Sequence, residues 1–202
     1  MVLVTGIILG YLIGSIPFAL IIGKLFYKTD IREHGSGNLG GGNTGRVLGK
    51  KAGLSVMTCD ILKVSFVILI VRLMGGGDLA IACAAAAAAI GHCFPVFAGF
   101  RGGKAVAAMY GFFFGLFAFA GRSVLIFLIP LAVFMIVLYF FRIIALSSMV
   151  SAAAGALLLC LMHDSMPIRA AAFFFVFLIV VRHRSNLKRM LEHRENKITW
   201  MS

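Results

Sequence analysis

Residues 32–53 read REHGSGNLGGGNTGRVLGKKAG, a polar, glycine-rich and basic stretch that directly follows a long apolar run. Its segment GSGNLG, residues 35–40, matches the G-x-G-x-x-G pattern of dinucleotide-binding loops. That interpretation requires a preceding β-strand, a following helix and an acidic residue about twenty positions further on. Here the preceding element is long enough to span a membrane, no strand–helix–strand pattern is present, and Asp60 lies within a second apolar run. The stretch therefore indicates a polar loop at the end of a membrane helix.

The composition is that of an integral membrane protein. Of the 202 residues 61% are hydrophobic, against about 45–50% in soluble domains, and the mean hydropathy is +1.04. The net charge of +12 then reflects topology and affinity for anions, and we expect no nucleic-acid partner. With no separate polar region of domain size, we expect one domain over residues 1–202. The first apolar run has no basic start and no clear cleavage site, so we interpret it as a retained helix.

Seven apolar segments come close to the length of about 20 residues that a membrane span needs. They are residues 2–24, 54–73, 79–97, 105–121, 123–141, 144–162 and 166–181. We therefore expect an all-α bundle of seven transmembrane helices, of which the last is the shortest. Fifteen basic residues lie in or beside the segments 24–53, 98–104, 142 and 182–197, against three on the opposite side. This asymmetry predicts an outside N-terminus, a cytoplasmic C-terminus and all polar segments on the cytoplasmic face.

Small residues at helical spacing predict close helix packing. Consecutive G-x-x-x-G steps run from Gly6 to Gly14, and another joins Gly111 to Gly115. Pro17 is expected to kink the first helix. The four cysteines lie in apolar runs without C-x-x-C spacing. We interpret them as small buried side chains, and expect neither a disulfide framework nor a metal site.

The glycine-rich loop is a candidate anion-binding site. Glycines can take the positive φ that turns several backbone N–H groups toward one point, and neutral donors and one guanidinium accompany them. The candidates are Gly35, Ser36, Gly37, Asn38, Gly40, Gly41, Gly42, Asn43 and Arg46. The alternative is a flexible linker. The alternation of glycine with Ser, Asn and Arg beside a helix start favours a binding loop.

A second polar segment, GHCFPVFAGFRGGKAVA at residues 91–107, indicates the same chemistry. Gly102 and Gly103 precede Lys104 at the start of an apolar helix, where a helix N-terminus and an ammonium group can meet one phosphate. His92, near the end of the preceding span, is a further candidate. Its alternative role is that of a packed polar side chain.

The third segment is RHRSNLKRMLEHRENK, residues 182–197. At helical spacing His183, Asn186, Met190 and His193 share one face among basic residues. A basic helix resting on anionic lipid has the same pattern and is the alternative.

Two opposite charges lie inside the second span. Asp60 and Lys63, spaced i, i+3, can pair on one face of the helix. Charges within a span usually face the bundle interior and are functional candidates. A purely structural ion pair explains them equally well.

Together the three segments indicate phosphate chemistry at the lipid boundary, as in an enzyme that joins a water-soluble phosphate compound to an acyl chain. The segments GSGNLGGGNTGRVLG, GHCFPVFAGFRGGKAVA and RHRSNLKRMLEHRE resemble, in order, the three motifs of the bacterial PlsY family of acyltransferases. The resemblance implies seven transmembrane helices around a cytoplasm-facing cleft in the bacterial cell membrane, with no metal or other cofactor. It also implies acyl transfer from acyl phosphate to the 1-hydroxyl of glycerol 3-phosphate, which gives lysophosphatidic acid and phosphate in phospholipid synthesis. We expect a monomer.

The same resemblance implies roles for individual residues. Ser36, Arg46 and Lys104 would hold phosphate groups, and His183 and Asn186 would contact glycerol 3-phosphate. The remaining substrate-binding candidates are Gly35, Gly37, Asn38, Gly40, Asn43, His92, Gly102, Gly103 and Glu195. An acyl phosphate is a mixed anhydride with a good leaving group, so no covalent intermediate is needed once cationic side chains relieve the repulsion between two anionic substrates. Three groups are candidates for the acceptor of the hydroxyl proton: His183, His92 and a substrate phosphate.

Four positions depart from the family pattern. Gly42 replaces a threonine, whereas Val64, Ala105 and His193 each stand where the family usually has glycine. Because the charged and polar residues of the motifs are intact, we expect activity. The alternatives are a diverged or inactive paralogue and a small anion or lipid transporter. A transporter would favour internal repeats and polar groups near mid-membrane, which the sequence does not clearly show.

Overall fold

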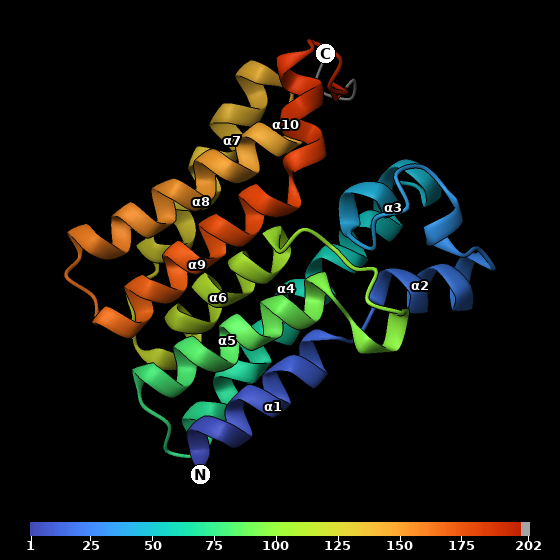
Figure 1. The fold of residues 1–202 in the computed structure, drawn as a ribbon. Helices are drawn as coiled ribbons and strands as arrows, with labels where there is room; N and C mark the ends of the chain where they lie inside the picture. Colours follow the sequence, from blue (N-terminus) through green and yellow to red (C-terminus); the bar gives the residue numbers. More distant parts are fainter. Residues whose placement is uncertain (199–202) are drawn as a thin grey trace.

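The computed structural model describes residues 1–198, which form helices joined by short loops (Figure 1). The elements are α1 (Val2–Gly14), α2 (Phe18–Tyr27), η1 (Ile31–Glu33), α3 (Gly41–Leu48), α4 (Lys50–Leu73), α5 (Asp78–Cys93), η2 (Val96–Ala98), α6 (Val106–Ala120), α7 (Leu125–Phe141), α8 (Ile144–Leu161), α9 (Met166–Arg182) and α10 (Arg184–Leu191), of which η1 and η2 are short 3-10 helices. A helix satisfies its own backbone hydrogen bonds in lipid, where water is absent. The predicted all-α membrane fold is thus confirmed.

Each of the seven apolar segments forms helix, but the segments differ in length. Within residues 1–198, four helical stretches are long and apolar enough to cross a membrane: Val2–Tyr27, Lys50–Leu73, Asp78–Ala98 and Ile144–Leu161. A fifth results if α9 and α10, bent by 59° at their junction, count as one span. Helices α6 and α7 are apolar but have only 15 and 17 residues. The chain is therefore multi-pass, and the number of seven crossings stays a prediction.

The first predicted span is divided near Pro17. Helix α1 ends at Gly14 and α2 begins at Phe18, because proline has no N–H to continue the helical hydrogen bonds. A kink was predicted at Pro17, and the structure shows a break between two helices there. Beside the break, the carbonyl oxygen of Ile16 accepts a hydrogen bond from Lys63 Nζ at 3.0 Å.

Glycines bring the helices into backbone contact, as the G-x-x-x-G steps predicted. A Cβ on Gly10 would lie 2.4 Å from the carbonyl oxygen of Ala84, and one on Gly14 would lie 2.2 Å from that of Ala88. On α6, a Cβ on Gly111 would lie 2.3 Å from the carbonyl oxygen of Ile61. Any side chain at these positions would separate α1 from α5 and α6 from α4.

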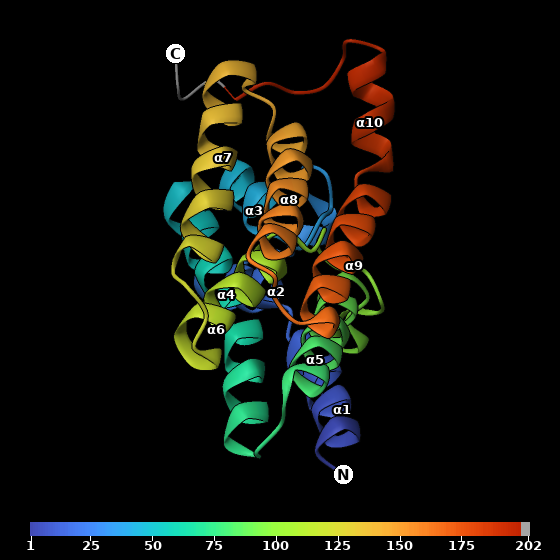
Figure 2. The same ribbon diagram turned by 90° about the vertical axis from the view of Figure 1, so that its left-hand side faces the viewer.

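The polar segments gather at one part of the bundle, away from the N-terminus. Helices α3 and α10, which belong to the first and third segments, lie away from the N-terminus in Figure 1, and α10 reaches the same level as the end of α7. After α10 the chain crosses to the end of α7 (Figure 2), where the N–H of Ile198 donates to the carbonyl of Arg142 at 2.9 Å. At the opposite end, Arg122 joins the start of α5 to the loop between α8 and α9, because it pairs with Asp78 at 2.6 Å and with Asp164 at 3.0 Å.

Candidate active site

A hydrogen-bonded chain joins the second and third motifs. Lys104 Nζ donates to Asn186 Oδ1, Asn186 Nδ2 donates to Glu195 Oε1 at 2.6 Å, and Arg189 Nε donates to Glu195 Oε2 at 2.7 Å. Asn186 and the carboxylate of Glu195 are each only 8% exposed. Three predicted site residues thus form one network, to which the structure adds Arg189.

Positive charge is concentrated around Lys104. Burial lowers the pKa of its ammonium group, and the nearby charges of Arg189, Arg182 and Arg46 lower it further, while Glu195 acts in the opposite direction. One carboxylate among four cations leaves the cluster with an excess of positive charge. Such a site favours the binding of an anion, which would relieve the mutual repulsion of the cations.

His183 lies just past the end of α9 and is buried. Its Nδ1 is 2.8 Å from the carbonyl oxygen of Ile179, and since a carbonyl only accepts, Nδ1 carries the hydrogen and Nε2 a free lone pair. Burial lowers the pKa of His183 to about 4, although the hydrogen bond to Ile179 acts to raise it. The imidazole is therefore neutral near pH 7 and can accept a proton at Nε2.

Arg182 connects α9 to the second motif, a role that the sequence did not reveal. Its Nε donates to the carbonyl of Gly103 at 3.0 Å and its Nη2 to that of Gly102 at 3.3 Å. Its guanidinium also lies 4.9 Å from the ring centre of Phe94. The basic tail suggested either phosphate or lipid contacts. Sequence could not show that Arg182 holds the turn before Lys104, because the two groups in contact are about 80 residues apart in the chain.

The first motif is ordered by Asn43, which is almost fully buried. Its Oδ1 accepts the N–H of Ser36 at 2.9 Å, and its Nδ2 donates to the carbonyl of His34 at 3.1 Å. Gly35 and Gly37 have φ of 61° and 67°, as a glycine-dependent turn requires. The N–H of Gly37 donates to the carbonyl of His34 at 3.1 Å. The N–H groups of Ser36 and Gly37 therefore stabilise the loop itself and are not free for the predicted anion nest.

The other candidates of the first motif lie around this loop. Asn38 is half-buried, and Gly40 precedes the first residue of α3. The side chains of Ser36 and Arg46 are exposed. Arg46 is close enough for its charge to act on Lys104, which relates the first motif to the network of the other two.

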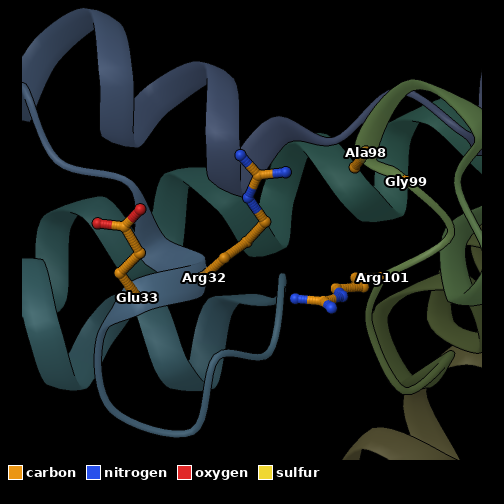
Figure 3. Close-up of a pocket in the computed structure, with 5 residues that line it drawn as sticks. All are labelled: Arg32, Glu33, Ala98, Gly99 and Arg101. Atoms are coloured by element: carbon orange, nitrogen blue, oxygen red, sulfur yellow. The ribbon is translucent and has the colours of Figure 1, made fainter.

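Two hollows differ in their surroundings: one adjoins the first and second segments, and the other lies among the apolar helices. One, of about 420 Å³, lies between η1 and η2 and is lined by Arg32, Glu33, Ala98, Gly99 and Arg101 (Figure 3). None of its lining residues was a predicted site residue. The other, of about 520 Å³, is an apolar groove lined by Ile13, Ile16, Phe18, Cys59, Leu62, Lys63, Phe66, Phe114 and Phe119.

The predicted ion pair inside the second span is present. Lys63 Nζ lies 2.7 Å from Asp60 Oδ1, and both side chains are buried. His92, the remaining histidine candidate, packs beside this pair, with its Nδ1 3.2 Å from Lys63 Nζ. It is 5% exposed. It lies against Gly102 and Gly103, and it is not a member of the network of Lys104 and Asn186.

Comparison with known proteins agrees with this geometry. The family model described as glycerol-3-phosphate acyltransferase matches residues 4–193. The chain is 44% identical to a glycerol-3-phosphate acyltransferase of Geobacillus kaustophilus, over 96% of this chain and 95% of the relative. It is 45% identical to glycerol-3-phosphate acyltransferase 2 of Bacillus anthracis, over 95% and 97%.

Solved structures agree as well. The glycerol 3-phosphate form of PlsY, an integral membrane glycerol 3-phosphate acyltransferase, superposes with a TM-score of 0.90 at 33% identity, over 98% of this chain and 96% of that one. Its lysophosphatidic acid form gives a TM-score of 0.88 at the same identity, over 98% and 95%. Sequence and fold thus agree over nearly the whole length, and the chain belongs to the glycerol-3-phosphate acyltransferase family of integral membrane enzymes, of the PlsY type.

Proposed function

We propose that this acyltransferase uses acyl phosphate as donor and acylates the 1-hydroxyl of glycerol 3-phosphate, releasing lysophosphatidic acid and phosphate. The observation that carries the proposal is the network of Lys104, Asn186 and Glu195 beside a buried, neutral His183. It combines excess positive charge for two phosphate groups with a base for one hydroxyl proton. The chain works as a single domain and as a monomer.

The roles of the residues follow from their positions. Lys104 and Arg46 hold phosphate oxygens, and the two positive charges relieve the repulsion between two anionic substrates. Ser36 adds a hydroxyl donor from the exposed loop that Asn43 orders. Asn186 orients glycerol 3-phosphate, and Glu195 fixes the orientation of Asn186 through the hydrogen bond to Nδ2.

The chemical step is a direct displacement. The 1-hydroxyl oxygen forms a bond to the acyl carbonyl carbon, the bond between that carbon and the bridging oxygen breaks, and phosphate leaves with the electron pair. His183 Nε2 takes the hydroxyl proton, because it has a lone pair and its Nδ1–H is held by the carbonyl of Ile179. Among the three candidate proton acceptors, His183 is therefore the one we propose.

The apolar groove supports a long-chain acyl donor. Its lining of aliphatic and aromatic side chains from α1, α2, α4 and α6 has a single charged member, Lys63. An acyl chain in lipid can occupy such a groove without leaving an apolar environment. We propose that the groove holds the acyl chain and that its polar end approaches the motifs.

We further propose seven crossings, an outside N-terminus and an active site on the cytoplasmic face. The asymmetry of fifteen basic residues against three supports this orientation. The test is labelling by a membrane-impermeant thiol reagent in a cysteine-free background. Ser185→Cys and Arg101→Cys should label only from the cytoplasmic side and Ser123→Cys only from outside. Labelling of Ser185→Cys and Arg101→Cys from opposite sides would overturn the single-site arrangement.

The reaction itself is tested by phosphate release from palmitoyl phosphate, with and without glycerol 3-phosphate. We expect release that depends on glycerol 3-phosphate and yields lysophosphatidic acid. Lys104→Ala should abolish it, whereas Lys188→Ala, which removes an exposed lysine of α10, should not. Folded protein that releases no phosphate, or a fully active Lys104→Ala variant, would contradict the proposal.

A further inference from the structure

A buried polar cluster lies next to Gly102 and Gly103 of the second motif, and the proposed reaction gives its side chains no role. Asp60, Lys63 and His92 are 2%, 6% and 5% exposed. Lys63 Nζ lies 2.7 Å from Asp60 Oδ1, 3.0 Å from the carbonyl oxygen of Ile16 and 3.2 Å from Nδ1 of His92. The cluster joins α4, the break between α1 and α2, and α5.

The hydrogen bonds of Lys63 assign it a supporting role. An ammonium group has three hydrogens and no lone pair, and Asp60, Ile16 and His92 supply three acceptors for them. No hydrogen of Lys63 then remains for a substrate oxygen, although its side chain lines the apolar groove. Lys63 can act on the reaction only through the residues it holds.

The same contact fixes the protonation of His92. Nδ1 of His92 also lies 3.6 Å from Asp60 Oδ1, which is too long for a hydrogen bond, so its partner is Lys63 Nζ at 3.2 Å. Because an ammonium group cannot accept a hydrogen bond, Nδ1 is the acceptor, and the ring hydrogen lies on Nε2. The charges agree with this state: Asp60 and Lys63 neutralise each other, while an imidazolium would leave an uncompensated charge in the bundle. His92 is therefore held as one neutral tautomer.

His92 in turn supports the turn that carries Lys104. Its carbonyl oxygen accepts the N–H of Gly103 at 2.9 Å. A Cβ on Gly103 would lie 2.0 Å from His92 Nε2, and one on Gly102 would lie 2.2 Å from the His92 carbonyl oxygen. Gly103 thus packs against the imidazole ring and Gly102 against the backbone carbonyl of His92, so a rotation of the ring would displace Gly103 and the Lys104 that follows it.

We propose that Asp60 and Lys63 are positioning residues for acyl transfer. They lock His92 in its Nε2–H tautomer and in one orientation, and His92 sets the place at which Lys104 meets Asn186. The kinetic consequence rests on the proposed function, whereas the tautomer and the position of the turn rest on the geometry alone.

The kinetic test uses the double variant Asp60→Leu/Lys63→Met. It removes both charges together, so that neither is left buried without its partner. Because a displacement of about 1 Å can cost about a hundredfold in rate, we expect kcat/KM for acyl transfer to fall about tenfold to a hundredfold. The matched control is Ser65→Ala, which loses a buried hydrogen bond from the same helix to the carbonyl of Gly111 at 2.8 Å without touching His92. Its kcat/KM should change little. If the double variant does not fold, Asp60→Asn/Lys63→Gln takes its place.

The spectroscopic test is ¹⁵N NMR of the protein labelled at histidine rings and asparagine side chains. Signals of His92 and Asn186 are identified by their loss in His92→Gln and Asn186→Leu. We expect His92 to carry its hydrogen on Nε2 in the unaltered protein and to become a tautomer mixture in the double variant, with a shift of the Asn186 amide signal.

The outcomes separate the two proposals. Hydrogen on Nδ1, or a charged imidazolium, in the unaltered protein would overturn the lock. A folded double variant with unchanged kcat/KM and an unchanged Asn186 signal would overturn the positioning role. If the unaltered protein transferred no acyl group from acyl phosphate, the proposed reaction would fail, while the two NMR results would still decide the positioning proposal.

Discussion

His193→Gly is expected to stabilise the folded chain, and Ala105→Gly to leave its stability nearly unchanged. Both residues take the left-handed backbone region, with φ of 54° and 62°, where a side chain costs about 1–2 kcal/mol. Glycine removes this cost but loses about 0.5–1 kcal/mol more backbone entropy on folding. At the exposed His193 the net gain is therefore about 0.5–1 kcal/mol. At Ala105, which is fully buried, loss of the methyl group costs about 0.8 kcal/mol and cancels the gain.

The assay is thermal unfolding of purified protein in one detergent. For a chain of this length about 1 kcal/mol corresponds to about 2–4 °C, so His193→Gly should raise Tm by roughly 1–4 °C while Ala105→Gly moves it little. Ala105→Val adds a branched side chain at a positive φ in a filled site, and should lower both Tm and activity because Lys104 is the preceding residue. An unchanged Tm for His193→Gly, or a stable and fully active Ala105→Val, would refute the reasoning.

Three further predictions concern the site. Glu195→Gln should lower Tm by about 2–6 °C, because the charge is lost and an NH₂ donor replaces one of the two acceptor oxygens. Glu192→Gln, from an exposed ion pair, should leave Tm unchanged; equal effects would contradict the network. Because the pKa of His183 is about 4 in the free enzyme, its neutral form persists as pH falls until about pH 4. The profile of kcat/KM should therefore show no inflection due to His183 near the ordinary value of about 6.5; an inflection there that disappears in His183→Gln would contradict the prediction. Asn43→Ala should reduce activity more than Ser36→Ala, since it releases the whole loop; proteolysis of the loop would report the release, and a protected loop would contradict it.

Local properties of the chain were enough to predict much of the fold. Runs of apolar residues gave the seven helical segments, and Pro17 gave the interruption between α1 and α2. The G-x-x-x-G steps predicted that the first helix packs closely against a neighbour, and the structure shows that this neighbour is α5. The expected span at residues 2–24 nevertheless became two helices, and the number of crossings depends on helices α6 and α7 of borderline length.

The motifs identified the residue types of the site but not their partners. Sequence placed Lys104 in the second segment and Asn186 and Glu195 in the third, and the structure joins them in one network that also includes Arg189. Sequence gave two interpretations of His92, a site residue and a packed polar side chain. In the structure His92 packs against Lys63, and its carbonyl oxygen also accepts the N–H of Gly103 in the second motif.

What the sequence determined by itself is therefore the class of protein: a membrane-embedded helical bundle with three polar motifs, for which it predicts phosphate binding. These depend on composition and on spacing within one segment, which are local quantities. Only the tertiary structure decided that Arg182 donates to the carbonyl of Gly103 and that Nε2 of His183 is the free ring nitrogen. It also decided that Lys63 Nζ contacts Asp60, His92 and the carbonyl of Ile16. Those are distances between groups on different helices, and they are set by how the whole bundle packs.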